Sequence, residues 1–425
     1  MENTKRISSN RKIASFILVL VFSLSIILQI MPSVKATFAG GSGTIGDPYQ
    51  ISNVTQLQEM QGFLSSYFIL INNIDATITS TWNDGSGFIP INGFGGSFDG
   101  QNHTISNLYI NNVTYSNTGF IGYNGGTIKN LGLINVNITG LDDTSGVVGY
   151  NNGHVTNCYS TGVVKGRDYI GGIGGDTLPF SVITNCYSRC KVISTNIDAG
   201  GLVGWNQGII TNCYATGNVL SSTHAGGLIG YEYQGTVTNC YSTGTVTAPT
   251  YAGGLIGVNY NWWGIITCCY WDIQTSGMES SQGGEGRTTA QMTYPYEGYD
   301  PPCAGLYQGW DLANYMGNTT SIWVHDDPQN GGYPLFRTDY VPHPSPTQDI
   351  IVTLAFYGPY WDINHDGNTN YLDVSSLVSH YGDTVTPRPP RYKGDDRWDI
   401  TGDGAVDYLD ISSLVTHYGE RWLVP

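Results

Sequence analysis

Six copies of a glycine-rich block recur along the middle of the chain at a nearly constant spacing. Each copy follows the pattern Gly-aliphatic-aliphatic-Gly-aromatic, which is clearest at residues 201–205 (GLVGW) and degenerate in two of the copies. The first Gly of each copy lies at position 119, 146, 172, 201, 227 or 254, which gives steps of 27, 26, 29, 26 and 27 residues. A period of this length is typical of stacked repeat proteins. It constrains the fold more than any other feature of the chain.

A second series of short motifs runs in phase with this block. The tripeptide Asn-Cys-Tyr begins at Asn157, Asn185, Asn212 and Asn239, and a related copy ends at Tyr270. A unit of about 27 residues is too short for two helices and their turns, and its β-branched runs show no 3.6-residue period. Glycine makes up 57 of the 425 residues, as expected where tight turns are frequent. We therefore predict an all-β fold, a parallel β-helix or β-solenoid with these repeats as its coils.

Stacked coils place equivalent residues about 4.8 Å apart, so each motif should form a ladder. Asn suits the bends because it tolerates the left-handed backbone conformation. We expect the Cys ladder to face the interior, either as reduced thiols packed as small apolar groups or as disulfides between coils. Strand alternation then turns the following Tyr ladder outward, as an exposed stripe able to bind flat sugar faces or as a half-buried stack. This Tyr ladder comprises Tyr159, Tyr187, Tyr214, Tyr241 and Tyr270.

The two motifs together resemble the GLUG motif family, which occurs in bacterial and archaeal surface proteins and adhesins. Residues 201–206 (GLVGWN) followed by residues 211–217 (TNCYATG) carry the likeness, which covers residues 117–272. Solenoids need capped ends because open strand edges can pair with other chains. The resemblance implies an N-terminal capping segment with the first irregular coils at residues 37–116 and a C-terminal cap at residues 273–340.

Residues 1–36 have the pattern of a signal peptide. Basic residues precede an apolar run from Ile13 to Met31, and small residues near Ala36 offer a cleavage site. An uncleaved anchor is the alternative, because the run approaches the length that spans a membrane. We predict a secreted or cell-surface protein with no membrane span after cleavage. The formal net charge of -16 excludes nucleic acid as an expected partner, because binding to phosphates depends on Lys and Arg.

The composition changes after a Pro-rich linker at residues 341–349. Residues 350–425 contain two loops of the pattern D-x-[N/T]-x-D-G, each closed by an acid at its twelfth position. This spacing gathers oxygens from positions 1, 3, 5, 7, 9 and 12 around one hard cation, as in EF-hand loops, so we predict two Ca²⁺ sites. The first site comprises Asp362, Asn364, Asp366, Asn368, Asn370 and Asp373, and the second comprises Asp399, Thr401, Asp403, Ala405, Asp407 and Asp410.

Each loop runs into a similar helical sequence, at residues 371–382 and 408–419. The pair resembles a dockerin domain, a small α-helical calcium-binding module that attaches cellulosomal enzymes to cohesins. The resemblance implies a cohesin-like or other surface protein as the partner. Dockerins usually carry Ser-Thr before the last ligand, whereas this chain carries Tyr-Leu in both copies. We assign the partner contacts to Tyr371, Leu372, Tyr408 and Leu409.

Two functions remain open at this stage. The first is a non-catalytic surface or matrix protein whose solenoid serves adhesion or binds a glycan or a protein. The alternative is a polysaccharide lyase or glycoside hydrolase of the β-helix type, which requires a base or closely grouped acids. Within residues 107–272 we expect no counterpart on neighbouring coils for the acidic pair Asp142-Asp143, and we interpret His224 as a surface residue. No catalytic residue is assigned.

Overall fold

The structure is a computed structural model, and it describes residues 38–260 and 264–293 together with five short pieces between Tyr307 and Phe336. The chain divides into two units, residues 1–340 and 341–425, and every described residue belongs to the first. The predicted signal peptide, the Pro-rich linker and the dockerin-like domain lie outside the described residues. In the part that is described, no helix has the length and apolar character needed to cross a membrane.

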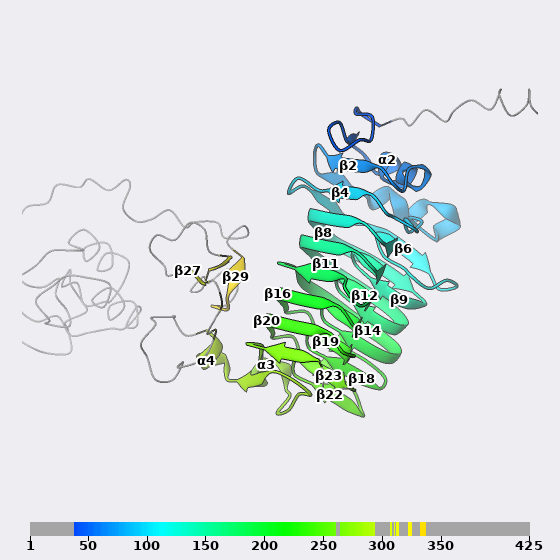
Figure 1. Cartoon of the computed structure of the whole chain (residues 1–425). Coiled ribbons are helices and arrows are strands. Elements are labelled where there is room, and N and C mark those ends of the chain that lie inside the picture. The colour runs from blue at the N-terminus through cyan, green and yellow to red at the C-terminus, as the bar shows by residue number, and fades with distance from the viewer. Residues whose placement is uncertain are drawn as a thin grey trace, which may run out of the picture. The chain divides into compact units, whose positions relative to one another are not determined.

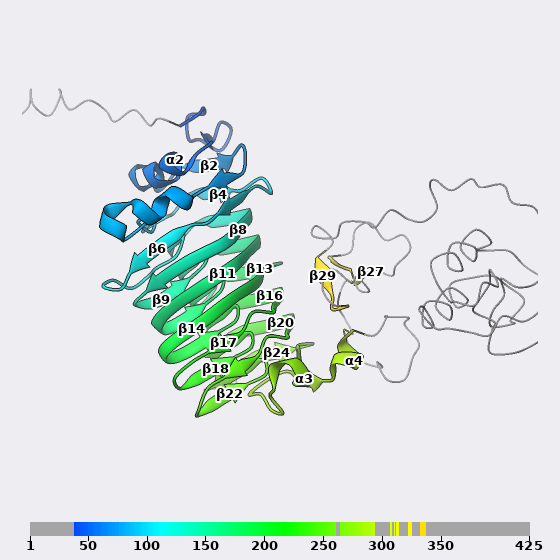
Figure 2. The ribbon, with the colours of Figure 1, turned by 180° about the vertical axis from the view of Figure 1, so that it is seen from behind.

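The coils stack in chain order along one axis (Figures 1 and 2). One face is a six-stranded parallel sheet to which each glycine-rich block contributes a strand. Its strands are β7 (Ile121–Asn124), β10 (Val148–Asn151), β12 (Gly174–Thr177), β15 (Val203–Asn206), β19 (Ile229–Glu232) and β23 (Ile256–Asn259). Trp205 of β15 is in register with Tyr231 of β19. Equivalent positions of successive blocks are therefore neighbours in space.

The Asn-Cys-Tyr motifs lie in a second, larger sheet. Its strands within the repeats are β8 (Thr127–Gly140), β9 (Asp142–Ser145), β11 (His154–Gly171), β13 (Val182–Thr184), β14 (Tyr187–Gly200), β16 (Ile209–Ala215), β17 (Val219–Leu220), β18 (His224–Gly226), β20 (Thr236–Ser242), β21 (Val246–Thr247), β22 (Tyr251–Gly253), β24 (Ile265–Thr267) and β25 (Tyr270–Asp272). Tyr187 pairs in parallel with Tyr159 on one side and with Tyr214 on the other. The prediction of an all-β parallel solenoid is confirmed.

The interior is one continuous apolar column. Leu202 and Val203 are fully buried in it, as are most of the aliphatic pairs of the other blocks. The Cys ladder also faces the column, and its buried members are Cys158, Cys186, Cys213, Cys240 and Cys269. All the described cysteines are free, and the thiol of Cys213 donates to the carbonyl of Thr211 at 3.2 Å. Of the two alternatives for these residues, the structure has unbridged thiols packed as small apolar groups.

A ladder of Asn side chains marks the bend before the Cys ladder. Asn157, Asn185, Asn212 and Asn239 have φ values between 51° and 54°. The amide of Asn185 donates to Asn157 at 3.1 Å, and the amides of Asn212 and Asn239 continue the chain at 3.2 Å each. Each amide therefore satisfies its neighbour, and Asn can adopt a conformation that most residues avoid.

Residues 38–116 close the N-terminal end of the column. Their elements are β1 (Tyr49–Ile51), α2 (Val54–Glu59), β2 (Tyr67–Leu70), β3 (Ile74–Asp75), β4 (Ser97–Asp99), β5 (Thr104–Ser106), β6 (Tyr109–Asn112) and short 3-10 helices at Met60–Gly62, Thr77–Thr81 and Asn83–Gly85. Asn53 caps α2 by accepting from the backbone N–H of Gln56 at 3.1 Å. Rings of Phe38, Tyr49 and Phe68 pack against one another at this end. They shield the first coil from water.

The other end of the column is covered by the chain that follows the last repeat. Strand β26 (Glu285–Arg287) pairs in parallel with β25, and two short helices flank it, α3 (Ile273–Ser276) and α4 (Thr289–Met292). Asp272 caps α3 by accepting from the backbone N–H groups of Gln274 and Thr275. These elements continue the sheet beyond the last coil of the repeat.

The Tyr ladder points out of the column, as predicted, but it is not an exposed stripe. Rings of Tyr187 and Tyr214 stack with centroids 4.7 Å apart and planes within 2° of parallel, and Tyr214 and Tyr241 are fully buried. The residues that cover them come from the C-terminal segment, and we call them the aromatic cover: Met292, Tyr307, Trp310, Trp323, Tyr333 and Phe336.

Part of the aromatic cover belongs to a small sheet of β27 (Leu312–Ala313), β28 (Trp323–Val324) and β29 (Leu335–Phe336). The hydroxyl of Tyr241 donates to the carbonyl of Pro334 at 2.6 Å. Of the two alternatives for this ladder, the structure has the stack and not the exposed sugar-binding stripe, because a segment far along the chain buries the rings.

Candidate functional site

A second series of aromatic residues lies on the six-stranded sheet, at the last position of the glycine-rich block. Parallel register aligns them in a series that we call the ring ladder: Tyr123, Tyr150, Asp176, Trp205 and Tyr231. Tyr123 and Tyr150 stack with ring centroids 5.6 Å apart, and Trp205 and Tyr231 lie 4.7 Å apart. All five side chains are half-buried. Ring stacking therefore runs along the surface of the solenoid and breaks at Asp176.

A second series runs beside the ring ladder, at the bend that precedes each block. Register aligns its members, which we call the bend ladder: Asp143, Tyr169, Asp198, His224 and Tyr251. The first three have φ values of 48°, 60° and 57°. These φ values lie in the left-handed region, which Asp tolerates and which is costly for Tyr. The bend ladder therefore holds an aromatic residue in a conformation that its own preferences do not explain.

Glycines allow the two ladders to approach closely. A Cβ on Gly175, beside Asp176, would lie 2.7 Å from the Cα of Asp143. A Cβ on Gly204, beside Trp205, would collide with the backbone of Tyr169. These contacts explain why the second Gly of the block recurs. They also place Asp143 next to Asp176 and Tyr169 next to Trp205.

At the break in the ring ladder, the side chain of Asp176 has Tyr150, Asp143, Tyr169 and Trp205 as neighbours, and we call these five residues the Asp176 notch. Among the described residues, Tyr150 has a stacked ring on one side only, that of Tyr123. Tyr169 meets Trp205 edge-on at 4.9 Å and 76°. The notch therefore combines aromatic surfaces with two carboxyl groups.

The two carboxyl groups of the notch are poorly solvated. Burial, together with the negative charges of Asp176, Asp142 and Asp168, raises the pKa of Asp143 to about 7. Burial also raises the pKa of Asp176 to about 6, although hydrogen bonds from Gln207 and the backbone of Thr177 oppose the shift. Within the described part of the chain, Oδ1 of Asp176 and Nε1 of Trp205 have no hydrogen-bond partner. Both of these atoms are buried from solvent.

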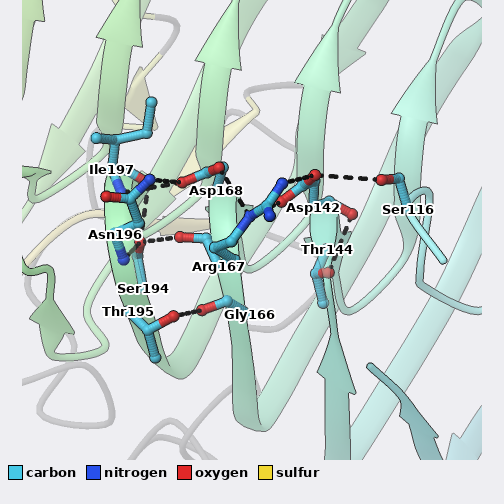
Figure 3. Close-up of polar contacts among 10 residues, drawn as sticks. All are labelled: Ser116, Asp142, Thr144, Gly166, Arg167, Asp168, Ser194, Thr195, Asn196 and Ile197. Atoms are coloured by element: carbon cyan, nitrogen blue, oxygen red, sulfur yellow. Dashed lines mark hydrogen bonds and ion pairs between the residues drawn. The ribbon is translucent and has the colours of Figure 1, made fainter. Parts of the chain in front are cut away.

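A network of charged groups borders the bend ladder (Figure 3). Arg167 binds Asp142 at 2.7 Å and Asp168 at 3.1 Å, and Asn196 donates to Asp168 at 2.7 Å. Asp142 and Asp168 are in register on neighbouring coils. The expectation that Asp142-Asp143 has no acidic counterpart was therefore wrong: the repeat brings Asp168 beside Asp142 and Asp176 beside Asp143.

His224 is more constrained than the sequence suggested. Its Nδ1 lies 2.7 Å from Oδ1 of Asp198, and the two side chains are 19% and 1% exposed. Its ring meets that of Tyr251 edge-on at 5.0 Å. Burial raises the pKa of Asp198 to about 6, while the hydrogen bond and charge of His224 lower it. The interpretation of His224 as an ordinary surface residue was wrong, because a buried carboxyl group orients it.

The metal and partner residues expected in the C-terminal domain, including Tyr371, Leu372, Tyr408 and Leu409, lie outside the described residues. Inside them, no cluster of three or more His, Cys, Asp or Glu side chains is arranged to hold a metal ion. The notch residues were missed for a different reason. Aligning residues 172–176 (GIGGD) with the other blocks puts Asp176 at the aromatic position, and this substitution was the available signal.

Comparison with known proteins assigns part of the repeat to a described motif. The family described as the GLUG motif matches residues 195–220 and 221–247. These coils are GLUG motifs. Halomucin of Haloquadratum walsbyi is 42% identical to this GLUG-containing chain over 118 residues, which are 26% of this chain and 1% of halomucin. A candidate Gly-rich membrane protein of Evansella cellulosilytica is 30% identical over 143 residues, which are 32% of this chain and 16% of that protein.

The fold of the GLUG coils also has a relative among solved structures. It is a crystal structure of a candidate immunoglobulin A1 protease from Bacteroides ovatus, with a TM-score of 0.55 and 24% sequence identity. The match covers 71% of this chain and 95% of that one. At this level of identity the likeness concerns the fold alone. The chain spans only a small part of the two sequence relatives named above.

The carboxyl groups of the notch predict how stability changes with pH. Their pKa values of about 7 and about 6 in the folded chain exceed the ordinary value of 3.8. The folded state then binds more protons than the unfolded state between about pH 4 and pH 7, so stability falls as pH rises through that window. We expect the Asp143→Asn/Asp176→Asn double variant to exceed the wild type in unfolding free energy by on the order of 2 kcal/mol at pH 7.5.

The measurement is urea unfolding at pH 4 and pH 7.5. The gain should largely disappear at pH 4, where both carboxyl groups are protonated in the folded state and are roughly half protonated in the unfolded state. Replacing the exposed Glu279 with Gln provides the matched control, and its unfolding curve should follow the wild type at both pH values. An equal effect of the double variant at both pH values would contradict the assignment.

Proposed function

We propose that the chain is an exported modular surface or matrix protein whose solenoid binds a polysaccharide at the Asp176 notch. The observation that supports this most is the interruption of the ring ladder. Rings of Tyr150 and Trp205 flank Asp176 on the neighbouring coils, and Asp143 lies beside it. Apolar ring surfaces beside a few convergent polar groups are typical of small-molecule sites.

The chemistry of the notch suits a neutral sugar. A pyranose ring has apolar C–H faces that pack on aromatic rings and a rim of hydroxyl groups that donate and accept hydrogen bonds. The half-buried carboxyl group of Asp176 can accept from such a hydroxyl, and the ring of Trp205 can pack against a C–H face. Asp142, Asp143 and Asp168 add negative charge nearby. An anionic polysaccharide would be repelled, so the proposed ligand is uncharged.

The proposal that the protein is exported rests on observations separate from the notch. Residues 1–36 have the pattern of a signal peptide. The names of the two sequence relatives, halomucin and a Gly-rich membrane protein, fit proteins at the outer face of a cell. We therefore propose a secreted or cell-surface location.

The C-terminal residues 350–425 are proposed to attach the protein to a cohesin-like or other surface protein. The support is the duplicated loop with acids at calcium-binding spacing, such as Asp362, Asp366 and Asp373 in the first copy. We expect the isolated segment 349–425 to gain helical circular dichroism on calcium titration, because without the cation these carboxylates repel one another. No change at saturating calcium would contradict both Ca²⁺ sites. The Asp362→Asn/Asp399→Asn variant is the control.

A binding experiment tests the glycan proposal. The full chain is incubated with cellulose, xylan, mannan, β-1,3-glucan and chitin, and with pectin and alginate as anionic comparisons. We expect one or more neutral polymers to bind, and Trp205→Ala and Asp176→Asn each to weaken that binding at least about tenfold. Tyr67→Ala changes an exposed ring on β2 and should bind as the wild type does. Failure of the wild type to bind any neutral polymer would exclude the proposal.

Glycoside hydrolysis is the second candidate function, and the carboxyl pair favours it. A retaining or inverting hydrolase needs one protonated and one ionised carboxyl group beside the bond that it cleaves. Burial and neighbouring charge keep Asp143 protonated closer to neutral pH than Asp176. Reducing sugars released in the same incubation would support hydrolysis, and unsaturated products would indicate a lyase. Binding without product would leave the non-catalytic function.

A further inference from the structure

A second polar group faces the same side of the solenoid as the notch. His224 lies at the start of β18, next to Asp198 in the bend ladder. Asp198 is 1% exposed, so its carboxyl group is committed to Nδ1 of His224 at 2.7 Å. A hydrogen bond at one imidazole nitrogen fixes the tautomer and the ring orientation. Asp198 is thus a positioning residue for His224.

The other side of the imidazole lies among exposed aromatic rings. Tyr251 is 49% exposed and meets His224 edge-on, and the ring of Tyr231 lies 6.5 Å away. Tyr260 is 65% exposed and stacks on Tyr231 at 6.2 Å. Among the described residues, Nε2 of His224 has no hydrogen-bond partner. When Asp198 is ionised and accepts a hydrogen bond from the Nδ1–H of a neutral His224, Nε2 is left as an acceptor for a ligand hydroxyl.

The register of the strands sets the distance along the solenoid axis between the Asp176 notch and His224. Along the ring ladder, Asp176 is followed by Trp205, Tyr231 and Val258 on successive coils. Tyr231 lies close enough to Asp198 for that charge to raise its pKa. The notch and His224 are therefore two to three coils apart, each coil adding about 4.8 Å along the axis. This step is close to the length that one pyranose adds to an extended β-linked glycan.

We propose that Asp198 and His224 form a second sugar subsite, so that the ligand is an extended neutral oligosaccharide that runs along the solenoid axis from the Asp176 notch. This inference rests on the proposed function. Tyr231 and Tyr251 provide the apolar contact, and Nε2 of His224 accepts a hydrogen bond from a sugar hydroxyl. A disaccharide reaches only the notch. A chain of about four units occupies both subsites.

Affinity as a function of ligand length tests the second subsite. Full-length protein is titrated calorimetrically with cello-, xylo-, manno- and laminari-oligosaccharides of two to six units. We expect the affinity of the wild type to rise about tenfold between two and four units, because a second hydrogen bond and ring contact are added. His224→Ala should abolish this rise and leave disaccharide binding within about twofold of wild type.

Four further variants separate the possible outcomes. Asp176→Asn should weaken binding of every length, and Asp198→Ala should reduce the length-dependent rise because His224 loses its orientation. His103, whose Nδ1 lies 3.2 Å from Asn73 near the N-terminal end, provides the matched control as His103→Ala. His224→Asn repeats the test should the alanine variant melt early.

An unchanged rise with length in both His224 variants would overturn the second subsite and leave the notch in place. Equal loss at every length would also overturn it, because His224 would then act on the notch itself. No binding by wild type at any length would overturn the proposed function, and the second subsite with it.

Discussion

A chain carrying Val203→Asp is expected to lose its folded solenoid. Val203 is fully buried and packs in the central column, between Gly174 on one neighbouring strand and Ile229 on the other. A carboxylate there would be desolvated without a partner, which costs more than about 4 kcal/mol. Each coil is stable only against its neighbours, so damage to a central coil should propagate along the stack.

Circular dichroism and thermal unfolding would measure this loss. Leu220→Asp gives the matched control, because Leu220 lies on β17 of a neighbouring part of the repeat but is 43% exposed. We expect its melting temperature to stay within a few degrees of wild type. A Val203→Asp variant with a wild-type melting curve would mean that the aliphatic pair of the block does not line the column.

The interior of the solenoid could be predicted from the sequence because the repeat motif within each coil determines which side chains face inward. A fixed period with β-branched residues and Gly requires stacked strands, and alternation then decides that Cys213 faces in and Tyr214 faces out. Both orientations were confirmed. Burial of Tyr214 could not be predicted in the same way. It depends on Trp323 and Phe336, which the sequence separates from the ladder by about a hundred residues and which carry no matching repeat.

The candidate site was missed because it arises from departures from the repeat. Asp176 replaces an aromatic residue, and Asp143, Tyr169 and Asp198 sit at a bend whose motif is not shared between coils. A consensus pattern emphasises what recurs, whereas a ligand site needs residues that differ from it. The irregular steps of 26 to 29 residues also hide the alignment of Asp142 with Asp168. Only the register of the strands brings these acids together.

Trp323→Ala is expected to release the aromatic cover from the Tyr ladder without unfolding the solenoid. Trp323 is fully buried, and its ring lies 4.5 Å from Phe336, 4.6 Å from Trp310 and 6.0 Å from Tyr214. Truncation of a buried Trp costs about 3 to 5 kcal/mol. Trp323 contacts both the other rings of the cover and the Tyr ladder, whereas the coils have their own continuous sheets and their column of aliphatic residues. The lost packing energy should therefore weaken the binding of the aromatic cover to the Tyr ladder and leave the coils folded.

Hydrogen exchange would distinguish release of the cover from unfolding. We expect faster exchange at residues 307–336 in Trp323→Ala, with unchanged exchange in β15 and β19 of the column. The newly exposed stack of Tyr187, Tyr214 and Tyr241 should also bind an apolar dye, because a contiguous aromatic patch of this kind is otherwise covered. Tyr260→Ala removes a ring that is 65% exposed and should change neither signal. Unaltered exchange at residues 307–336 would show that Trp323 does not hold the cover, and faster exchange throughout the coils would show that the cover supports the solenoid as a whole.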